Sequence, residues 1–352
     1  MRKRFCLLLL LQLLLCSGCG IWKQHPPLEA VETAETVGLD LDAQVTASAT
    51  TGSGEDDERF TASGETVPLA LDALQSRSLH GGLFYGHTQY LLLGEDFARA
   101  GIQPLLDYAA RSAELRLLTP VFILRGETAE TVLTGDPDAT AQLTALARSG
   151  APRCTALDTA DRLARTGTAL LGAVHYDCKE KTLTPDGCAV LKNGKLVGYL
   201  DAEAWFFGSE TEKLSIPQGA TVTLKQCSLQ LKADWAGDTP SALRLLVDAD
   251  AEVDQLDADI RITDDAVRAG LEQSLAETLA HRMAATIGQT QALEADALGL
   301  GDLLAAAHPI RWRSLHGAWE TMFPGLTVTV EVTARITGTQ DLSDPLPEEG
   351  ET

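Results

Sequence analysis

Apolar and polar residues alternate along several stretches of the chain, and this pattern predicts most of its strands. Alternation with a period of two places successive side chains on opposite faces, so that one face is buried and the other is polar. Short continuous apolar runs predict strands that are buried on both faces. The predicted strands cover residues 37–51, 59–63, 89–93, 115–124, 169–174, 221–231, 243–262 and 326–336.

Apolar residues at helical spacing separate several of these strands. Thr66 is the expected N-cap of one helix, and further helices are predicted at about 95–110 and 127–133. The longest predicted helix covers residues 263–286, with Thr263 as its N-cap and an apolar stripe along one face. This order of strands and helices predicts sheets with helices packed against them.

The clearest predicted hairpin lies within residues 188–200, where Asn193 and Gly194 stand between two apolar runs. An Asn-Gly pair is a strong hairpin signal because both residues accept the positive φ of a tight turn. A second turn is predicted at 183–187, which contains a proline and a glycine.

These elements predict a mixed α+β protein. We expect several consecutive small domains, each with a mostly antiparallel or mixed sheet and packed helices. The predicted divisions are a signal peptide at 1–18, a membrane-proximal spacer at 19–36, an N-terminal region of two subdomains at 37–200, a C-terminal domain at 201–340 and a disordered acidic tail at 341–352.

The start of the chain has the features of a lipoprotein signal. Met1 is followed by three basic residues, an apolar run reaches Leu15, and small residues precede Cys19. The run is too short to span a bilayer, which requires about 20 apolar residues. We expect cleavage before Cys19, whose thiol then carries an acyl (palmitate) anchor on the outer face of the cytoplasmic membrane.

The net charge of the chain excludes some classes of binding partner. The chain of 352 residues has a formal net charge of −22. Such an acidic chain is repelled by nucleic acid and by anionic lipid head groups. No nucleic-acid partner is therefore expected, and the lipid tether is what holds the chain at the membrane.

Four cysteines follow the signal: Cys154, Cys178, Cys188 and Cys227. Disulfides form outside the cytoplasm, and four cysteines allow three pairings. Cys178 and Cys188 bracket the predicted turn and are the candidate pair, with scattered buried thiols as an equal alternative. Their spacing fits no standard zinc pattern, so no metal site is predicted.

One histidine invites a catalytic interpretation. His87 stands close to a predicted buried strand, where a histidine can act as a general base. No serine or cysteine elbow and no carboxylate pair with a catalytic signature accompanies it. The favoured interpretation is that His87 caps the strand and bonds to the backbone, because one histidine without partners does not make a site.

Two glycines and two tryptophans mark the C-terminal region. Gly299 and Gly301 are too close together for a dinucleotide-binding loop and follow no strand, so they predict a tight turn before a helix. Trp312 and Trp319 are seven residues apart, which places them on one helical face. We expect them to pack on the terminal sheet; an exposed pair would instead mark a partner surface.

Three separated segments share an order and spacing that are together specific. They contain an aromatic-Gly-His element before a strand ending in Gly-Glu, a Leu-Val-Gly hairpin, and an Asp-x-x-Gly-x-Gly element followed by two tryptophans. The residues concerned are Gly86, His87, Gly94, Glu95, Leu196, Gly198, Asp296, Gly299, Gly301, Trp312 and Trp319. Over about residues 19–338 the chain resembles the Ger(x)C lipoproteins, the C subunits of spore germinant receptors.

The resemblance implies a non-enzymatic, lipid-anchored subunit that carries no cofactor. It implies assembly with a polytopic A subunit and a transporter-like B subunit in the inner spore membrane, where nutrient binding triggers germination. The glycine, His87, Glu95 and tryptophan positions above are then candidate partner-binding or structural positions. A solute-binding lipoprotein with a ligand cleft between two lobes is the alternative, although the sequence shows no two-lobe repeat. An extracytoplasmic hydrolase is the third possibility.

Overall fold

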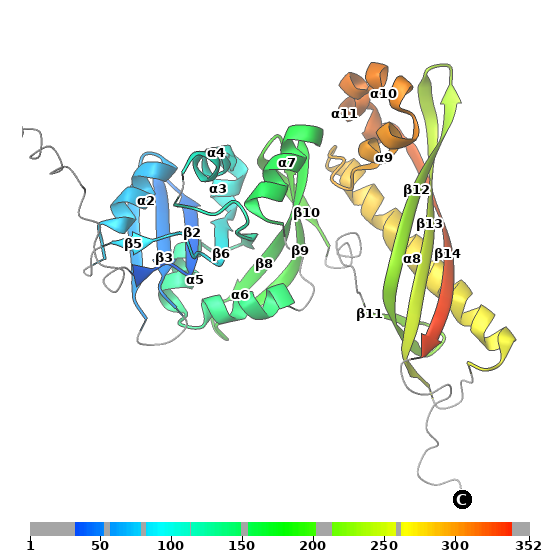
Figure 1. The fold of residues 1–352 in the computed structure, drawn as a ribbon, viewed down its shortest axis with the longest axis horizontal. Coiled ribbons are helices and arrows are strands. Elements are labelled where there is room, and N and C mark those ends of the chain that lie inside the picture. The colour runs from blue at the N-terminus through cyan, green and yellow to red at the C-terminus, as the bar shows by residue number, and fades with distance from the viewer. Residues whose placement is uncertain are drawn as a thin grey trace, which may run out of the picture.

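The computed structural model describes residues 32–52, 57–78, 82–112, 114–148, 154–201, 213–257 and 262–339. These residues form two layered units along the chain, one built on an eight-stranded sheet and one on a four-stranded sheet (Figure 1). The predicted mixed α+β class is confirmed. The signal, Cys19 and the acidic tail lie outside the described residues, and the predicted domain boundaries stay predictions.

The N-terminal unit contains ten strands and six helices among the described residues. They are β1 (Glu32–Thr33), β2 (Thr36–Leu41), β3 (Val45–Thr50), β4 (Arg59–Gly64), α2 (Val67–Gln75), β5 (Leu83–Phe84), β6 (Tyr90–Gly94), α3 (Glu95–Ala100), α4 (Gln103–Arg111), β7 (Val121–Arg125), α5 (Ala129–Gly135), α6 (Ala139–Arg148), α7 (Ala156–Thr166), β8 (Thr168–Asp177), β9 (Thr182–Lys192) and β10 (Lys195–Leu200).

The large sheet has the strand order β10-β9-β8-β7-β6-β2-β3-β4. Its central strands β2, β6, β7 and β8 are parallel, and antiparallel hairpins extend it at both ends. The sheet is continuous, so the two subdomains expected within 37–200 do not correspond to a break in it. Strand β1 pairs in parallel with β5, which means that the last residues of the expected spacer already belong to the fold.

Helices cover both faces of this sheet. On one face α2, α3, α4 and α7 bury Leu91 and Leu93 of β6, and on the other α5 and α6 bury Leu92. Apolar side chains on both faces explain why the central strands are continuous apolar runs rather than alternating ones. The predicted N-cap is confirmed, since the hydroxyl of Thr66 accepts from the N–H of Leu69 at the start of α2.

Two predicted elements are each divided in the structure. The strand predicted at 37–51 is the hairpin of β2 and β3, whose connection at residues 42–44 contains neither glycine nor proline. The helix predicted at 95–110 is two helices, because Gly101 adopts a φ of 131° and ends α3. A non-glycine residue rarely adopts that conformation.

The Asn-Gly hairpin is confirmed, with Asn193 and Gly194 at positive φ between β9 and β10. The turn predicted at 183–187 is wrong, because those residues belong to β9 and the chain turns earlier, at 178–181. Pro185 lies opposite Val174 beside a register shift at which β9 has one extra residue, where the ladder tolerates a missing N–H.

The candidate pair Cys178 and Cys188 is not bridged by a disulfide in this structure. Cys188 is buried within β9 and pairs in register with Gly172. Cys178 is exposed beyond the end of β8, six residues further along. That separation is roughly 20 Å along a strand, whereas bridged cysteines have Cα atoms within about 7 Å.

The C-terminal unit consists of the second sheet and its helices. They are β11 (Lys213–Ile216), β12 (Ala220–Ala236), β13 (Thr239–Leu256), α8 (Asp265–Ala292), α9 (Leu300–Ala307), α10 (Pro309–Leu315), α11 (Trp319–Met322) and β14 (Thr327–Thr339), with 3-10 turns at His316–Ala318 and Phe323–Gly325. The sheet order is β11-β12-β13-β14, and only the β13–β14 pair is parallel.

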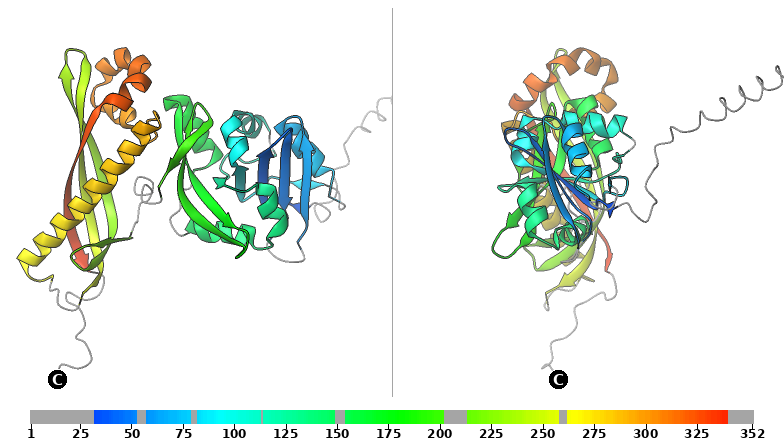
Figure 2. Two further views of the ribbon diagram at one scale, coloured as in Figure 1. Left: turned by 180° about the vertical axis from the view of Figure 1, so that it is seen from behind. Right: turned by 90° about the vertical axis from the view of Figure 1, so that its left-hand side faces the viewer.

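Helix α8 lies along one face of this sheet (Figure 2). Its predicted apolar stripe is confirmed: Leu271, Leu275, Leu279 and Met283 are buried in the core that α8 shares with the sheet, whose nearest strand is β14. The helix begins one residue later than expected, because the carboxylate of Asp264 caps the N–H of Ala266.

We expect the Gly194→Ala substitution to lower the free energy of unfolding by about 1–3 kcal/mol. Gly194 has a φ of 74°, and a Cβ there would collide with the side-chain amide of Gln103, which bonds to the carbonyl of Asn193. The matched control is Gly270→Ala in α8, where nothing lies near an added Cβ. That change should stabilise by about 0.5–1 kcal/mol. Urea unfolding of the wild type and the two variants measures both changes in the free energy of unfolding. Equal changes in the two variants would contradict the turn geometry at Gly194.

Candidate functional site

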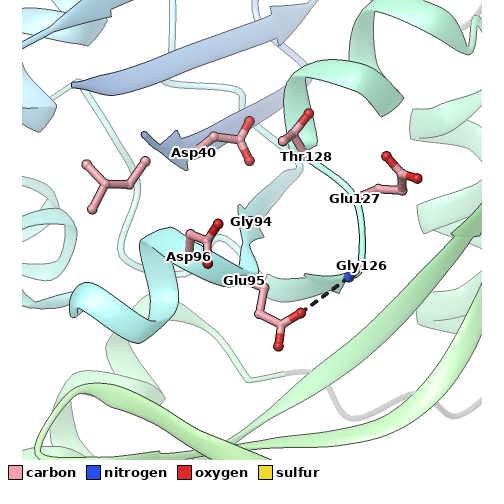
Figure 3. A pocket seen from close by; sticks show the side chains of 8 residues that line it. Asp40, Gly94, Glu95, Asp96, Gly126, Glu127 and Thr128 are labelled. Atoms are coloured by element: carbon pink, nitrogen blue, oxygen red, sulfur yellow. Dashed lines mark hydrogen bonds between the residues drawn. The ribbon is translucent and has the colours of Figure 1, made fainter. Parts of the chain in front are cut away.

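A pocket of about 200 Å³ lies where the parallel strands β2, β6 and β7 end (Figure 3). Ligands of open α/β sheets bind at this carboxyl edge, so it is the first place to look for chemistry. The lining residues are Asp40, Leu41, Gly94, Glu95, Asp96, Gly126, Glu127 and Thr128. It thus contains the predicted pair Gly94 and Glu95.

Asp40 is the buried acid of this pocket. Its two carboxylate oxygens accept from the N–H groups of Ala129 and Glu130, each at 2.8 Å, and so cap the start of α5. Burial raises the pKa of Asp40, and these two hydrogen bonds oppose the shift. Gly94 is required here, because a Cβ at that position would overlap a carboxylate oxygen of Asp40.

Glu95 connects two neighbouring segments. Its carboxylate accepts from the N–H of Gly126 at 3.3 Å and pairs with Arg99 one helical turn away. Burial opposes ionisation of Glu95, but the hydrogen bonds from Arg99 and Gly126 outweigh it and hold its pKa below the usual value. Glu95 therefore fixes the β7–α5 connection against the first turn of α3.

The acids of this pocket are mostly engaged in holding the fold. No group of three or more histidine, cysteine or acidic side chains is arranged to bind a metal ion in the described ranges. The two best-placed carboxylates, Asp40 and Glu95, already accept backbone N–H groups. These contacts have a structural role: they cap α5 and anchor the connection after β7.

Gly86 and His87 lie apart from the pocket, in the turn between β5 and β6. The exposed ring of His87 meets the ring of Phe84 edge to face, with centroids 5.5 Å apart. A Cβ on Gly86 would overlap the Phe84 ring, so the glycine permits this close approach. The role seen for His87 is this ring contact.

The C-terminal motif forms a second, buried cluster around Asp296, which lies in the turn between α8 and α9. Its carboxylate accepts from the N–H of Leu300 at 2.9 Å, from that of Gly301 at 2.6 Å and from the indole of Trp319 at 2.9 Å. Burial raises the pKa of Asp296, and these donors oppose the shift. Gly299 adopts a φ of 78° at the start of α9, as the predicted turn requires.

The two tryptophans do pack together, but not on one helical face. Trp312 belongs to α10 and Trp319 to α11, and their rings meet at 66° with centroids 5.4 Å apart. Gly301 lies beneath them, where an added Cβ would be 2.7 Å from the indole nitrogen of Trp319. Trp319 is buried in the core of the second unit, whereas Trp312 is partly exposed.

The turn that contains Asp296 also contacts the N-terminal unit. The hydroxyl of Thr168 donates to the carbonyl of Asp296 at 2.8 Å, and the ammonium of Lys192 donates to that of Glu294 at 2.8 Å. Lys192 also pairs with Glu320 at 2.8 Å. A small apolar cluster completes this contact, formed by Cys188, Val190, Leu200, Ala295 and Ala297.

Sequence reasoning found the motif residues but missed their partners. Asp40, Thr168 and Lys192 come from strands far from the motifs they contact. Asp40 carried one usable signal, since it is an acid inside an apolar run at 37–41 and a buried acid needs donors. Thr168 and Lys192 carried none, because surface polar residues at strand ends are common.

The fold and these two clusters define a two-unit α+β protein whose motif residues hold its turns and its unit contact in place. Two family profiles match the chain: the spore germination protein N-terminal domain over residues 29–167, and the spore germination B3/GerAC-like C-terminal domain over residues 186–340. The solved structure titled "Crystal Structure of the GerBC protein" is similar in fold, with a TM-score of 0.59 and 16% identity. The match covers 86% of this chain and 96% of that one.

A search of curated proteins returned no match. The two profiles together span most of the chain in the same order as its two units. The chain belongs to the GerAC, or Ger(x)C, family of spore germination proteins, and the resemblance seen in the sequence is confirmed.

We expect Asp296→Asn to lower the free energy of unfolding by about 1–3 kcal/mol, because an amide NH2 would face a backbone N–H or the Trp319 indole. The matched control is Asp302→Asn in the adjoining helix α9, which leaves the three donors satisfied and should change stability by less than about 0.5 kcal/mol. Urea unfolding followed by tryptophan fluorescence measures both. Equal costs at the two positions would show that the carboxylate does not organise the cluster.

Proposed function

We propose that the protein is the lipid-anchored C subunit of a spore nutrient germinant receptor and acts without catalysis of its own. Membership of the spore germination family, through both of its domains, is the observation that supports this proposal most strongly. The partners proposed are the membrane A and B subunits, and the site of action is the outer face of the inner spore membrane.

Attachment through Cys19 fits the described part of the chain. None of its helices is both long and apolar enough to cross a bilayer. A protein that works beside membrane subunits needs another means of attachment, and the signal ending at Cys19 supplies one. Acylation is effective because each buried methylene contributes about 0.8 kcal/mol of membrane affinity.

A role without catalysis fits the use of the acids. A general acid or base needs a reacting group within hydrogen-bond reach, yet Asp40 and Glu95 in the N-terminal pocket accept backbone N–H groups. Asp296 is held by three donors inside a core. Each motif carboxylate thus stabilises a turn or a helix start, which suits a scaffold for membrane partners.

Mass spectrometry of the N-terminal peptide, extracted from membranes, tests the anchor. We expect the mature chain to begin at Cys19 and to carry the mass of acyl chains. Cys16→Ala is the matched control, because Cys16 leaves with the signal and its loss should not change the mature peptide. Cys19→Ala should abolish acylation. An unmodified Cys19 in the wild-type peptide would refute the proposed attachment.

Deletion of the gene in spores tests the function. We expect germination with at least one nutrient to be lost, and to be restored by the wild-type chain but not by a chain lacking Cys19. The A and B subunits should co-purify with the restored protein from spore membranes. Normal germination with every nutrient, in a strain without a second receptor, would count against the proposal. Tight binding of a sugar or amino acid by the isolated chain would instead favour a solute-binding protein.

A further inference from the structure

A basic and apolar patch covers one end of the C-terminal unit, where α10 packs beside the tip of the β12–β13 hairpin (Figure 1). We define the α10 patch as five residues that share this end of the molecule. They are Trp235, His308, Ile310, Arg311 and Arg313.

The patch reverses the charge of the rest of the protein. The chain has a formal net charge of −22, yet no acidic residue occurs between Asp302 and Glu320. Arg311 and Arg313 are both exposed in this interval, and neither forms an ion pair with a carboxylate of the described residues. Free arginines on an acidic protein create a local site for an anionic surface.

An apolar side chain projects from the same place. Ile310 is 82% exposed, the largest value among the exposed large hydrophobic residues of the described chain. Beside it, Arg311 lies 4.2 Å above the ring of Trp235, and the ring of His308 meets that indole edge to face at 5.1 Å. The indole thereby fixes Arg311 next to the protruding isoleucine.

The nearby acids do not neutralise the arginines. Asp234 is paired with Arg244 at 3.0 Å, and Glu320 is paired with Lys192 at 2.8 Å. Asp238, exposed in the hairpin turn, and Asp302, in α9 beside α10, have no ion pair among the described residues. The two arginines nevertheless lie in a stretch of the chain, residues 303–319, that contains no acidic residue.

We propose that the α10 patch contacts the anionic phospholipid surface of the membrane to which the chain is anchored. Ile310 enters the interfacial layer, and Arg311 and Arg313 pair with lipid phosphates. This combination of an apolar side chain and cations is what interfacial segments use. A protein partner fits less well, because the patch protrudes and none of its residues lines the pocket at Asp40 or the pocket between β11 and α8.

This membrane contact rests on the proposed anchoring through Cys19, and it adds a defined orientation of the protein relative to the membrane. Strand β1, the described residue pair nearest to Cys19 in the chain, pairs with β5, which lies on the side of the N-terminal unit that faces away from the unit carrying α10 (Figures 1 and 2). Twelve residues lie between Cys19 and Glu32, and the chain from one to the other reaches at most about 45 Å. A second contact at α10 would hold both units along the membrane instead of letting them swing from one tether.

The test uses the full anchored chain in vesicles, with Cys178→Ser and Cys227→Ser to remove the two exposed thiols. A polarity-sensitive fluorophore is attached at Ile310→Cys, and quenching by phospholipids brominated near the head group reports contact. We expect strong quenching in vesicles that contain phosphatidylglycerol and little in pure phosphatidylcholine. Quenching should fall at high salt, since the Debye length is only about 3 Å at 1 M.

Three double variants test whether the arginine charges cause the membrane contact. Because a basic residue near an anionic surface contributes roughly fivefold, Arg311→Glu with Arg313→Glu should weaken the contact at least ~30-fold. Arg311→Lys with Arg313→Lys should retain it. Arg116→Glu with Arg148→Glu changes the net charge equally at exposed sites elsewhere and should also retain it. A label at Ala269→Cys, near the start of α8, should stay unquenched in every vesicle.

Each other outcome overturns the proposal. Absence of quenching in anionic vesicles, equal quenching in both lipids, or quenching that survives the double glutamate change would do so. Protection of the label only when membrane subunits are added would assign the patch to a protein instead. Vesicle flotation separates this result from failure of the anchor, because an anchored chain floats whether or not α10 touches lipid.

Discussion

The buried carboxylate of Asp296 is the interaction on which the C-terminal end of the structure depends. It gathers the first turn of α9 and the indole of Trp319, which are distant in the chain, onto one acceptor. Burial of a charged group is tolerated only when hydrogen-bond donors surround it, and three donors surround the carboxylate of Asp296. The same turn presents its carbonyls to Thr168 and Lys192, so the conformation set by Asp296 also sets where the N-terminal unit attaches.

Local signals predicted the elements that local forces determine. The Asn193-Gly194 turn and the Thr66 cap each depend on a few adjacent residues, and the structure has both. The turn at 42–44 escaped prediction because no glycine or proline marks it. Pro185 had the opposite effect: it suggested a turn, but the proline lies within β9 beside a bulge in that strand.

The candidate sites show the same difference between local features, which the sequence predicts, and tertiary contacts, which it does not. Gly94, Glu95, Gly299 and Gly301 were found from the sequence, but what each touches was not. The close approach of Asp40 to Gly94 depends on the register of β2 against β6, which periodicity does not specify. Spacing also failed for Trp312 and Trp319, because a 3-10 turn between α10 and α11 changes the direction of the chain before the rings meet.

The contact between the units has a consequence for orientation at a membrane. Three side chains of the N-terminal unit donate to main-chain carbonyls of residues 294–297: Thr168, Lys192 and Arg162. These hydrogen bonds between the units therefore depend on the backbone conformation of residues 294–297 more than on their side chains. That conformation includes a positive φ at Gly299, which glycine adopts readily, and a positive φ at Glu294, which is costly unless the surroundings hold it. Because Asp296 lies between them, it couples the placement of α10 at one end of the protein to the sheet that begins near the proposed anchor. A change at Asp296 should therefore alter how the whole protein is oriented at the membrane, even though the side-chain contacts seen for Asp296 are all within its own unit.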